Sequence, residues 1–182
     1  MNPSIFVSIS KEPGISSAER ENIRYDMFVA RLLKPLPEQL SALHIAVGLA
    51  GELGELFHED ADEIEECGDY EFYLQAALSH YGLTIFECYP HNFSLTVSDE
   101  EFVYWTGQLI DCIKREYIYN KPREIERIKK CLGTVNMYLT DTYTGMGTPR
   151  AEVLQANAIK LEKRYAGLYY SDEAAQARAD KN

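Results

Sequence analysis

Apolar residues recur every three or four positions along most of the chain, which is the spacing of one face of an α-helix. Ser98-Asp99-Glu100-Glu101 is a capping box that opens one helix, and Thr148-Pro149 supplies an N-cap and a first helical residue for another. No segment alternates apolar and polar residues as a half-buried strand would. The pattern therefore predicts an all-α protein, with helices over about residues 17–33, 38–58, 62–82, 98–119, 123–143 and 149–166. Residues 90–97 are expected to be irregular.

The predicted helix at residues 38–58 is apolar nearly all round, which is typical of a buried helix. Between Ala42 and Phe57 its only strongly polar side chains are His44, Glu52 and Glu55. A buried carboxylate without a partner is costly, so we expect positive charge to meet Glu52 and Glu55, which lie three residues apart on one face. His44 lies on the face of Glu55, where it either packs or supports the acids.

A second pair of acids, Glu66 and Asp69, repeats this spacing on the next helix. If the two helices bend near residues 60–61, residue 52 lies opposite 69 and residue 55 opposite 66. Four carboxylates would then converge, which requires bound cations or raised pKa values. Oxygen ligands suit Mg²⁺, with Mn²⁺ as a substitute. On an exposed helix the same spacing would give only solvated acids, as we expect for Glu59, Asp60, Asp62, Glu63 and Glu65.

The length and net charge of the chain exclude several classes of protein. The chain has 182 residues, enough for one domain, and its 18 Lys and Arg against 29 Asp and Glu give a net charge of −11. This balance argues against a general nucleic-acid or anionic-membrane binder. The four cysteines form no C-x-x-C pair, and no apolar run is long and uncharged enough to span a bilayer. We therefore expect a soluble, cytoplasmic protein with reduced thiols and no membrane partner.

Several stretches together resemble the MazG-like all-α nucleoside triphosphate pyrophosphohydrolases, a superfamily that includes dimeric dUTPases and phosphoribosyl-ATP pyrophosphohydrolase. The signature of that family is E-x-x-E on one helix and E-x-x-D on the next, matched here by Glu52, Glu55, Glu66 and Asp69. The segment 157–167 and the end of the chain, Ala177-Arg178-Ala179-Asp180, resemble the closing motif of the family, and Tyr25-Asp26-Met27-Phe28-Val29 fits its small members. The connection between Glu55 and Glu66 is shorter than in relatives.

The resemblance implies a four-helix-bundle-like fold built from two helical hairpins with flanking N- and C-terminal helices. It also implies Mg²⁺-dependent cleavage of an NTP or dNTP to the monophosphate and pyrophosphate. Glu52, Glu55, Glu66 and Asp69 would be the metal ligands and catalytic residues. Asn157, Lys160 and Arg164 would contact phosphate or sugar, although they could equally form the polar face of the last helix.

Further along, the chain resembles a second copy of the motif without its acids. Gly68, Tyr73, Leu74 and Gly82 match Gly133, Tyr138, Leu139 and Gly147 at an offset of 65. In this alignment Trp105 and Gln108 stand for Glu52 and Glu55, and Cys131 and Thr134 stand for Glu66 and Asp69. We interpret this as one domain, 1–182, with a metal-binding repeat at 16–89, a degenerate repeat and C-terminal helix at 98–170, and a polar tail at 171–182 that forms a short or fraying helix. An insertion without duplication is the alternative.

The second repeat could wall the substrate pocket and make the protein either a homodimer or a pseudo-dimeric monomer. Trp105 could stack on a base, or it could pack in the core, and Lys114 could reach phosphates, or it could be solvated. Two other functions remain open: a nucleotide or metal binder without turnover, and an acidic helical protein that engages a basic partner.

Overall fold

The computed structural model describes residues 17–89 and 96–181, and most of this part of the chain is helical. The helices are α1 (Ser17–Leu32), α2 (Glu38–Leu56), α3 (Glu63–Tyr81), α4 (Ile85–Cys88), α5 (Asp99–Tyr117), α6 (Ile125–Met146), α7 (Arg150–Arg164), α8 (Asp172–Ala177) and the 3-10 helix η1 (Ala179–Lys181). No strand occurs among the described residues, so the all-α prediction is confirmed. The segment predicted to be irregular, 90–97, lies mostly outside the described residues.

Capping residues set most of the helix boundaries. The Asp62 carboxylate accepts hydrogen bonds from two backbone N–H groups and so begins α3, and Ser98 forms the predicted capping box at the start of α5. Gly82 and Gly147 end α3 and α6 with φ angles of 64° and 66°, a left-handed conformation that costs glycine little. These boundaries agree with the predicted ones to within a few residues.

Two helix starts differ from the prediction. Pro149 is the N-cap of α7 rather than its first helical residue, so Thr148 lies before the cap. The backbone of Pro149 is extended, with φ −59° and ψ 142°, which makes it a half-in flanking residue. The short helix α4 was not predicted, because a single turn has no hydrophobic period; it begins with a capping box between Thr84 and Glu87.

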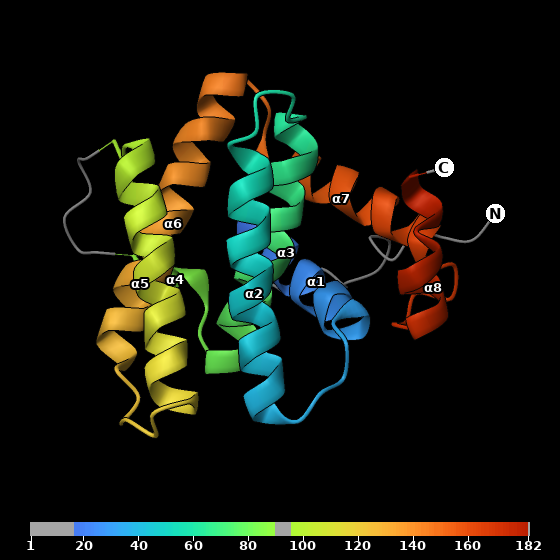
Figure 1. The fold of residues 1–182 in the computed structure, drawn as a ribbon. Coiled ribbons are helices and arrows are strands. Elements are labelled where there is room, and N and C mark those ends of the chain that lie inside the picture. The colour runs from blue at the N-terminus through green and yellow to red at the C-terminus, as the bar shows by residue number, and fades with distance from the viewer. Residues whose placement is uncertain (1–16, 90–95, 182) are drawn as a thin grey trace.

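Two antiparallel hairpins form the body of the fold. Helices α2 and α3 make the first hairpin and α5 and α6 the second, and they join where α2 packs against α5 (Figure 1). Helices α1 and α7 both contact α3, on the side away from the second hairpin, and α7 carries α8 and η1. The first hairpin therefore lies between the second hairpin and the flanking helices.

Aromatic side chains hold the helices at close distances. Phe102 of α5 lies with its ring centroid 5.1 Å from Tyr70 of α3 and stacks on Tyr138 of α6 at 4.1 Å. Gly48 of α2 lies against the ring of Tyr73 of α3, where a Cβ atom would come within 2.2 Å of the ring. The absence of a side chain at residue 48 thus lets α2 and α3 approach closely.

One acidic side chain is fully buried in the core. Glu71 of α3 has an exposed fraction of 0%, and its carboxylate accepts hydrogen bonds from Arg150 Nε at 2.6 Å and Nη2 at 2.8 Å. The Tyr143 hydroxyl donates to the same carboxylate at 2.9 Å. This group links α3 to α6 and α7, and its charge is balanced within the protein.

The sequence predicts no membrane-spanning segment. Over residues 17–89 and 96–181, none of the helices combines the length and the apolar composition needed to cross a bilayer. The most apolar helix, α2, contains Glu52 and Glu55.

Candidate metal centre

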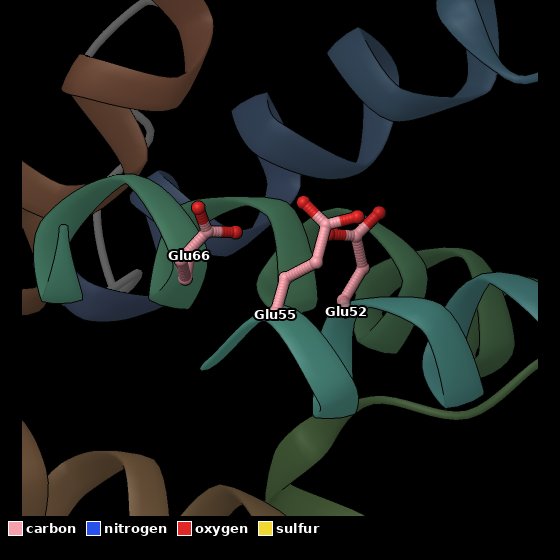
Figure 2. Close-up of side chains that lie close together, drawn as sticks. All are labelled: Glu52, Glu55 and Glu66. Carbon is pink, nitrogen blue, oxygen red and sulfur yellow. The ribbon is translucent and has the colours of Figure 1, made fainter. Parts of the chain in front are cut away.

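Three of the four predicted metal ligands meet at one end of the first hairpin. Glu52 and Glu55 lie in the last turns of α2, and Glu66 lies in the first turn of α3. The short loop at residues 57–62 brings these turns side by side. One carboxylate oxygen from each acid lies within 4.8 Å of the other two, and all three side chains point to the same side of the hairpin (Figure 2).

The three acids have too little positive charge around them. Burial raises the pKa of Glu52 to about 8, with further contributions from Asp69, Glu55 and Glu66. Burial and neighbouring acids also raise the pKa of Glu66. Among the described residues, the buried oxygens Glu52 Oε2 and Glu66 Oε2 have no hydrogen-bond partner. Both effects favour a bound proton or cation at this position.

Asp69 lies beside the three acids but is already paired. Its Oδ1 accepts a hydrogen bond of 2.7 Å from Asn157 Nδ2, and its Oδ2 accepts one from the Lys160 ammonium. Lys160 also donates to Glu65 at 3.1 Å. Burial raises the pKa of Asp69, and the charge of Lys160 opposes that shift. Asp69 therefore differs from the other three acids, because the protein supplies its cation.

The donor set fits a hard divalent cation. All the groups that converge are carboxylates, and Mg²⁺ and Mn²⁺ prefer oxygen ligands. Within this group, the buried oxygens that have no partner among the described residues belong to Glu52 and Glu66, on opposite helices of the hairpin. Glu52, Glu55 and Glu66 could hold such an ion, with Asp69 at its edge.

A cavity of about 260 Å³ adjoins the acids. Its lining contains acidic, basic and aromatic side chains from α1, α2, α3, α7 and the segment that follows α7. The lining residues are Leu32, Leu33, Lys34, His44, Glu52, Glu55, Asp69, Phe72, Tyr73, Leu161, Arg164, Tyr165, Tyr170, Ala175 and Arg178. Cations and aromatic rings thus share one cavity with the acids, a combination suited to a ligand with both phosphate and ring groups.

Two ion pairs attach the C-terminal segment to the wall of this cavity. Arg164 donates from Nε and Nη2 to the two oxygens of Asp180, at 2.7 and 2.6 Å, and the Asp180 side chain has an exposed fraction of 0%. The hydrogen bonds from Arg164 lower the pKa of Asp180 to about 2. Lys34 pairs with Asp172 of α8 at 2.5 Å. The predicted polar tail is thus partly helical and lies against the candidate site.

The predicted substrate contacts fall into two groups. Arg164 lines the cavity, and Asn157 and Lys160 reach it through Asp69. Trp105 and Lys114 of α5 do not line the cavity: the Lys130 ammonium lies 4.5 Å from the Trp105 ring centroid, and Lys114 pairs with Asp111 at 2.6 Å. Trp105 and Lys114 as substrate contacts stay predictions.

Sequence reasoning missed several lining residues. Tyr73 lies one turn after Asp69 in α3, so helical spacing could have identified it. Lys34 and Tyr170 come from segments far from the acids in sequence, and no spacing rule connects them. The buried Glu71, outside this site, was also missed because nothing in its local sequence indicates Arg150 as its partner.

Comparisons with protein-family models, with curated proteins and with solved structures find no match to this chain. The functional interpretation therefore depends on the residues and their geometry.

Proposed function

We propose that this protein is a Mg²⁺-dependent nucleotide pyrophosphohydrolase, which cleaves an NTP or dNTP to the monophosphate and pyrophosphate. The observation that carries the proposal is the group formed by Glu52, Glu55 and Glu66. Their carboxylate oxygens lie within 4.8 Å of one another, and two buried oxygens have no partner in the described part of the chain. A nucleotide with bound divalent cations supplies the charge that these acids need.

The lining of the cavity fits the remaining parts of such a substrate. Asp180 occupies only two donors of Arg164, and a guanidinium has further N–H donors for a phosphate oxygen. Lys34 adds a second positive charge to the same cavity. The rings of Phe72 and Tyr73, 5.4 Å apart, supply an apolar wall for a base or sugar.

The proposed reaction is attack of water on the α-phosphorus. The new P–O bond forms as the bond from the α-phosphorus to the bridging oxygen breaks, and pyrophosphate leaves with that oxygen. Bound divalent cations would neutralise the phosphate charge and lower the pKa of the attacking water. A carboxylate of the group that is not fully engaged would accept the proton of the water, and Arg164 would hold the phosphate charge.

A substrate panel with a matched variant tests this proposal. The protein is incubated with Mg²⁺ and each of the common NTPs and dNTPs, and pyrophosphate, phosphate and the nucleoside monophosphate are all measured. We expect equal amounts of monophosphate and pyrophosphate for at least one substrate, and none from a Glu52→Gln/Glu55→Gln variant whose helical content is unchanged. Wild-type protein that releases no monophosphate from any nucleotide contradicts the proposal.

One observation supports a second candidate function. Asp69 is paired with Lys160 instead of facing the other three acids with free oxygens. A chain with this pairing could bind a nucleotide and metal without turnover. Nucleotide binding measured by calorimetry, together with an absence of monophosphate in the same samples, would favour this candidate over the hydrolase.

A further inference from the structure

A buried chain of hydrogen bonds connects α1 to the candidate site. Tyr25 of α1 has an exposed fraction of 0%, and its hydroxyl donates to Asn157 Oδ1 at 2.8 Å. Asn157 of α7, with an exposed fraction of 2%, donates from Nδ2 to Asp69 Oδ1 at 2.7 Å. Side chains from three helices that are distant in sequence are thus linked by hydrogen bonds that end at the carboxylate of Asp69.

The chemistry of these groups determines which of them donates and which accepts in each hydrogen bond. An ionised carboxylate can only accept, so the amide of Asn157 must turn its NH₂ group toward Asp69. Its carbonyl oxygen then points at Tyr25, whose hydroxyl is a donor of suitable length there. The hydroxyl also has a longer contact of 3.4 Å to the carbonyl oxygen of Gly68. Removal of the Tyr25 hydroxyl would take away the donor to the buried Asn157 carbonyl oxygen, and the amide would then be held from the Asp69 side alone.

The close packing of α3 against α7 allows this contact between Asn157 and Asp69. A Cβ atom on Gly68 would lie 2.8 Å from the Cβ of Asn157, so glycine at this position allows α7 to approach the backbone next to Asp69. The Lys160 ammonium holds the second oxygen of Asp69. Both oxygens of this carboxylate therefore have donors, whereas Glu52 and Glu66 each have a buried oxygen that receives no hydrogen bond from the part of the chain that the structure describes.

We propose that Tyr25 is a positioning residue for the candidate site: acting through Asn157, it fixes the orientation of the Asp69 carboxylate beside Glu52, Glu55 and Glu66. The positioning role itself rests on the hydrogen bonds, and only the expected effect on kcat rests on the proposed function. Outer partners that orient a ligating carboxylate commonly change metal affinity or activity by about 10–100-fold when they are removed. In this proposal Tyr25 acts through Asn157 and does not itself contact the substrate.

The test is a double-mutant cycle with a matched tyrosine as control. Tyr25→Phe, Asn157→Ala and the double variant are compared with Tyr70→Phe, because Tyr70 is also fully buried and its hydroxyl makes one 2.7 Å hydrogen bond, to Thr106. Mn²⁺ affinity is measured by calorimetry for each protein, and kcat and KM are measured with the best nucleotide. Thermal unfolding shows whether each variant is folded at the assay temperature.

We expect Tyr25→Phe to weaken Mn²⁺ binding by about 10-fold and to lower kcat more than it raises KM. Because Tyr25 acts through Asn157, the double variant should bind Mn²⁺ no more weakly than Asn157→Ala alone. Tyr70→Phe should leave Mn²⁺ affinity unchanged. Equal losses in Tyr25→Phe and Tyr70→Phe, or losses that add in the double variant, would overturn the inference.

The cycle also separates this inference from the proposed function. If wild-type protein hydrolyses no nucleotide but Tyr25→Phe still weakens Mn²⁺ binding, the positioning role stands and the hydrolase proposal fails. If wild-type protein hydrolyses nucleotides and Tyr25→Phe matches it in both Mn²⁺ affinity and kcat, the positioning role fails and the hydrolase proposal stands.

Discussion

The two hairpins of the fold pack against each other but differ in how their polar and charged side chains are paired. At the end of α2 and the start of α3, Glu52, Glu55 and Glu66 lie together with little positive charge from the protein. The positions that the sequence repeat pairs with the four acids carry Trp105, Gln108, Cys131 and Thr134. In the second hairpin Arg127 donates to Gln108, and the Lys130 ammonium lies over the Trp105 ring.

The second hairpin pairs most of these polar groups within the protein. One buried oxygen there, Glu116 Oε2, has no hydrogen-bond partner among the described residues, but the other oxygen of that carboxylate accepts a hydrogen bond from Arg123 at 2.8 Å. A hydrogen bond between the thiols of Cys112 and Cys131 raises the pKa of Cys131, and the Thr134 hydroxyl donates to the carbonyl oxygen of Lys130 at 2.9 Å. In the first hairpin, by contrast, two buried carboxylate oxygens that have no partner within residues 17–89 and 96–181 belong to the same group of acids, Glu52 Oε2 and Glu66 Oε2. Two hairpins of similar architecture can thus differ in whether their polar side chains are paired within the protein or are available to bind a cation. A few side chains determine this difference.

Within the first hairpin, Glu71 is a fully buried acid whose charge is balanced by Arg150, and its removal should have the largest effect. Glu71→Ala removes the carboxylate that accepts hydrogen bonds from Arg150 and from the Tyr143 hydroxyl in the core. We expect a loss of about 3–5 kcal/mol in the free energy of unfolding, measured by urea denaturation. Glu126→Ala, at a side chain with an exposed fraction of 84%, should change stability by less than about 0.5 kcal/mol. Similar losses in both variants would contradict this reading of Glu71.

Glu55 and Gln108, which the proposed sequence repeat aligns with each other, test the comparison through activity. Glu55→Gln should lower kcat by about 100-fold or more, because it removes a charge that holds the cation and substrate. Gln108→Ala in the second hairpin should leave kcat within about twofold, because Gln108 accepts a hydrogen bond from Arg127 of the same hairpin and is not among the described residues that line the cavity. A loss of kcat in Gln108→Ala comparable to that in Glu55→Gln would show that both hairpins serve the reaction.

Two glycines test how closely the helices of each hairpin must approach. Gly48→Ala would place a Cβ atom 2.2 Å from the Tyr73 ring, which lines the cavity, so we expect a loss of about 1–3 kcal/mol in the free energy of unfolding. Gly107→Ala on α5 meets no atom within 4 Å and should stabilise the helix by up to about 1 kcal/mol. Chemical denaturation of both variants measures the difference, and a stabilised Gly48→Ala would contradict the packing described here.

The smallest effect concerns the stability of the first hairpin as the pH changes. The pKa of Glu52 is raised from 4.5 to about 8 in the folded protein, so the folded state keeps a proton that the unfolded chain has lost. In chelator, the stability of wild-type protein should be greatest below about pH 4.5 and decrease as the pH rises toward 8, as far as this group is concerned. Glu52→Gln should flatten this dependence and stabilise the protein by about 1–2 kcal/mol at pH 8, less than the full linkage value because solvent reaches the group.

Urea denaturation of both proteins in chelator at several pH values measures this difference. Addition of Mg²⁺ should stabilise wild-type protein and leave Glu52→Gln nearly unchanged. A wild-type stability that is independent of both pH and Mg²⁺ would contradict the electrostatic account of the site.

Local rules predicted most of the first hairpin. Asp62 and Gly82 cap the two ends of α3, as their residue types predict. The spacing of the acids about the turn correctly brought Glu52, Glu55 and Glu66 together, but the fourth acid, Asp69, is paired with Lys160 instead. The caps and the meeting of the three acids follow from short-range geometry that a sequence displays directly.

The rest depends on contacts between distant parts of the chain. The pairs Lys34–Asp172 and Arg164–Asp180 bring the C-terminal segment against the cavity, and the first joins residues 138 positions apart. Asn157 was predicted to touch substrate but lies buried between Tyr25 and Asp69. Such partners are selected by the packing of α1 and α7 on α3, which no local spacing encodes.

The central claim is that the acids of the first hairpin hold a divalent cation. Crystals grown with Mn²⁺ and a nucleoside triphosphate analogue that resists hydrolysis, measured at a wavelength where Mn²⁺ scatters anomalously, test it most directly. We expect an anomalous peak in contact with carboxylate oxygens of Glu52, Glu55 and Glu66, and no peak near Gln108 and Cys131. A map with no peak at these three acids, in a crystal that binds the analogue, would contradict it.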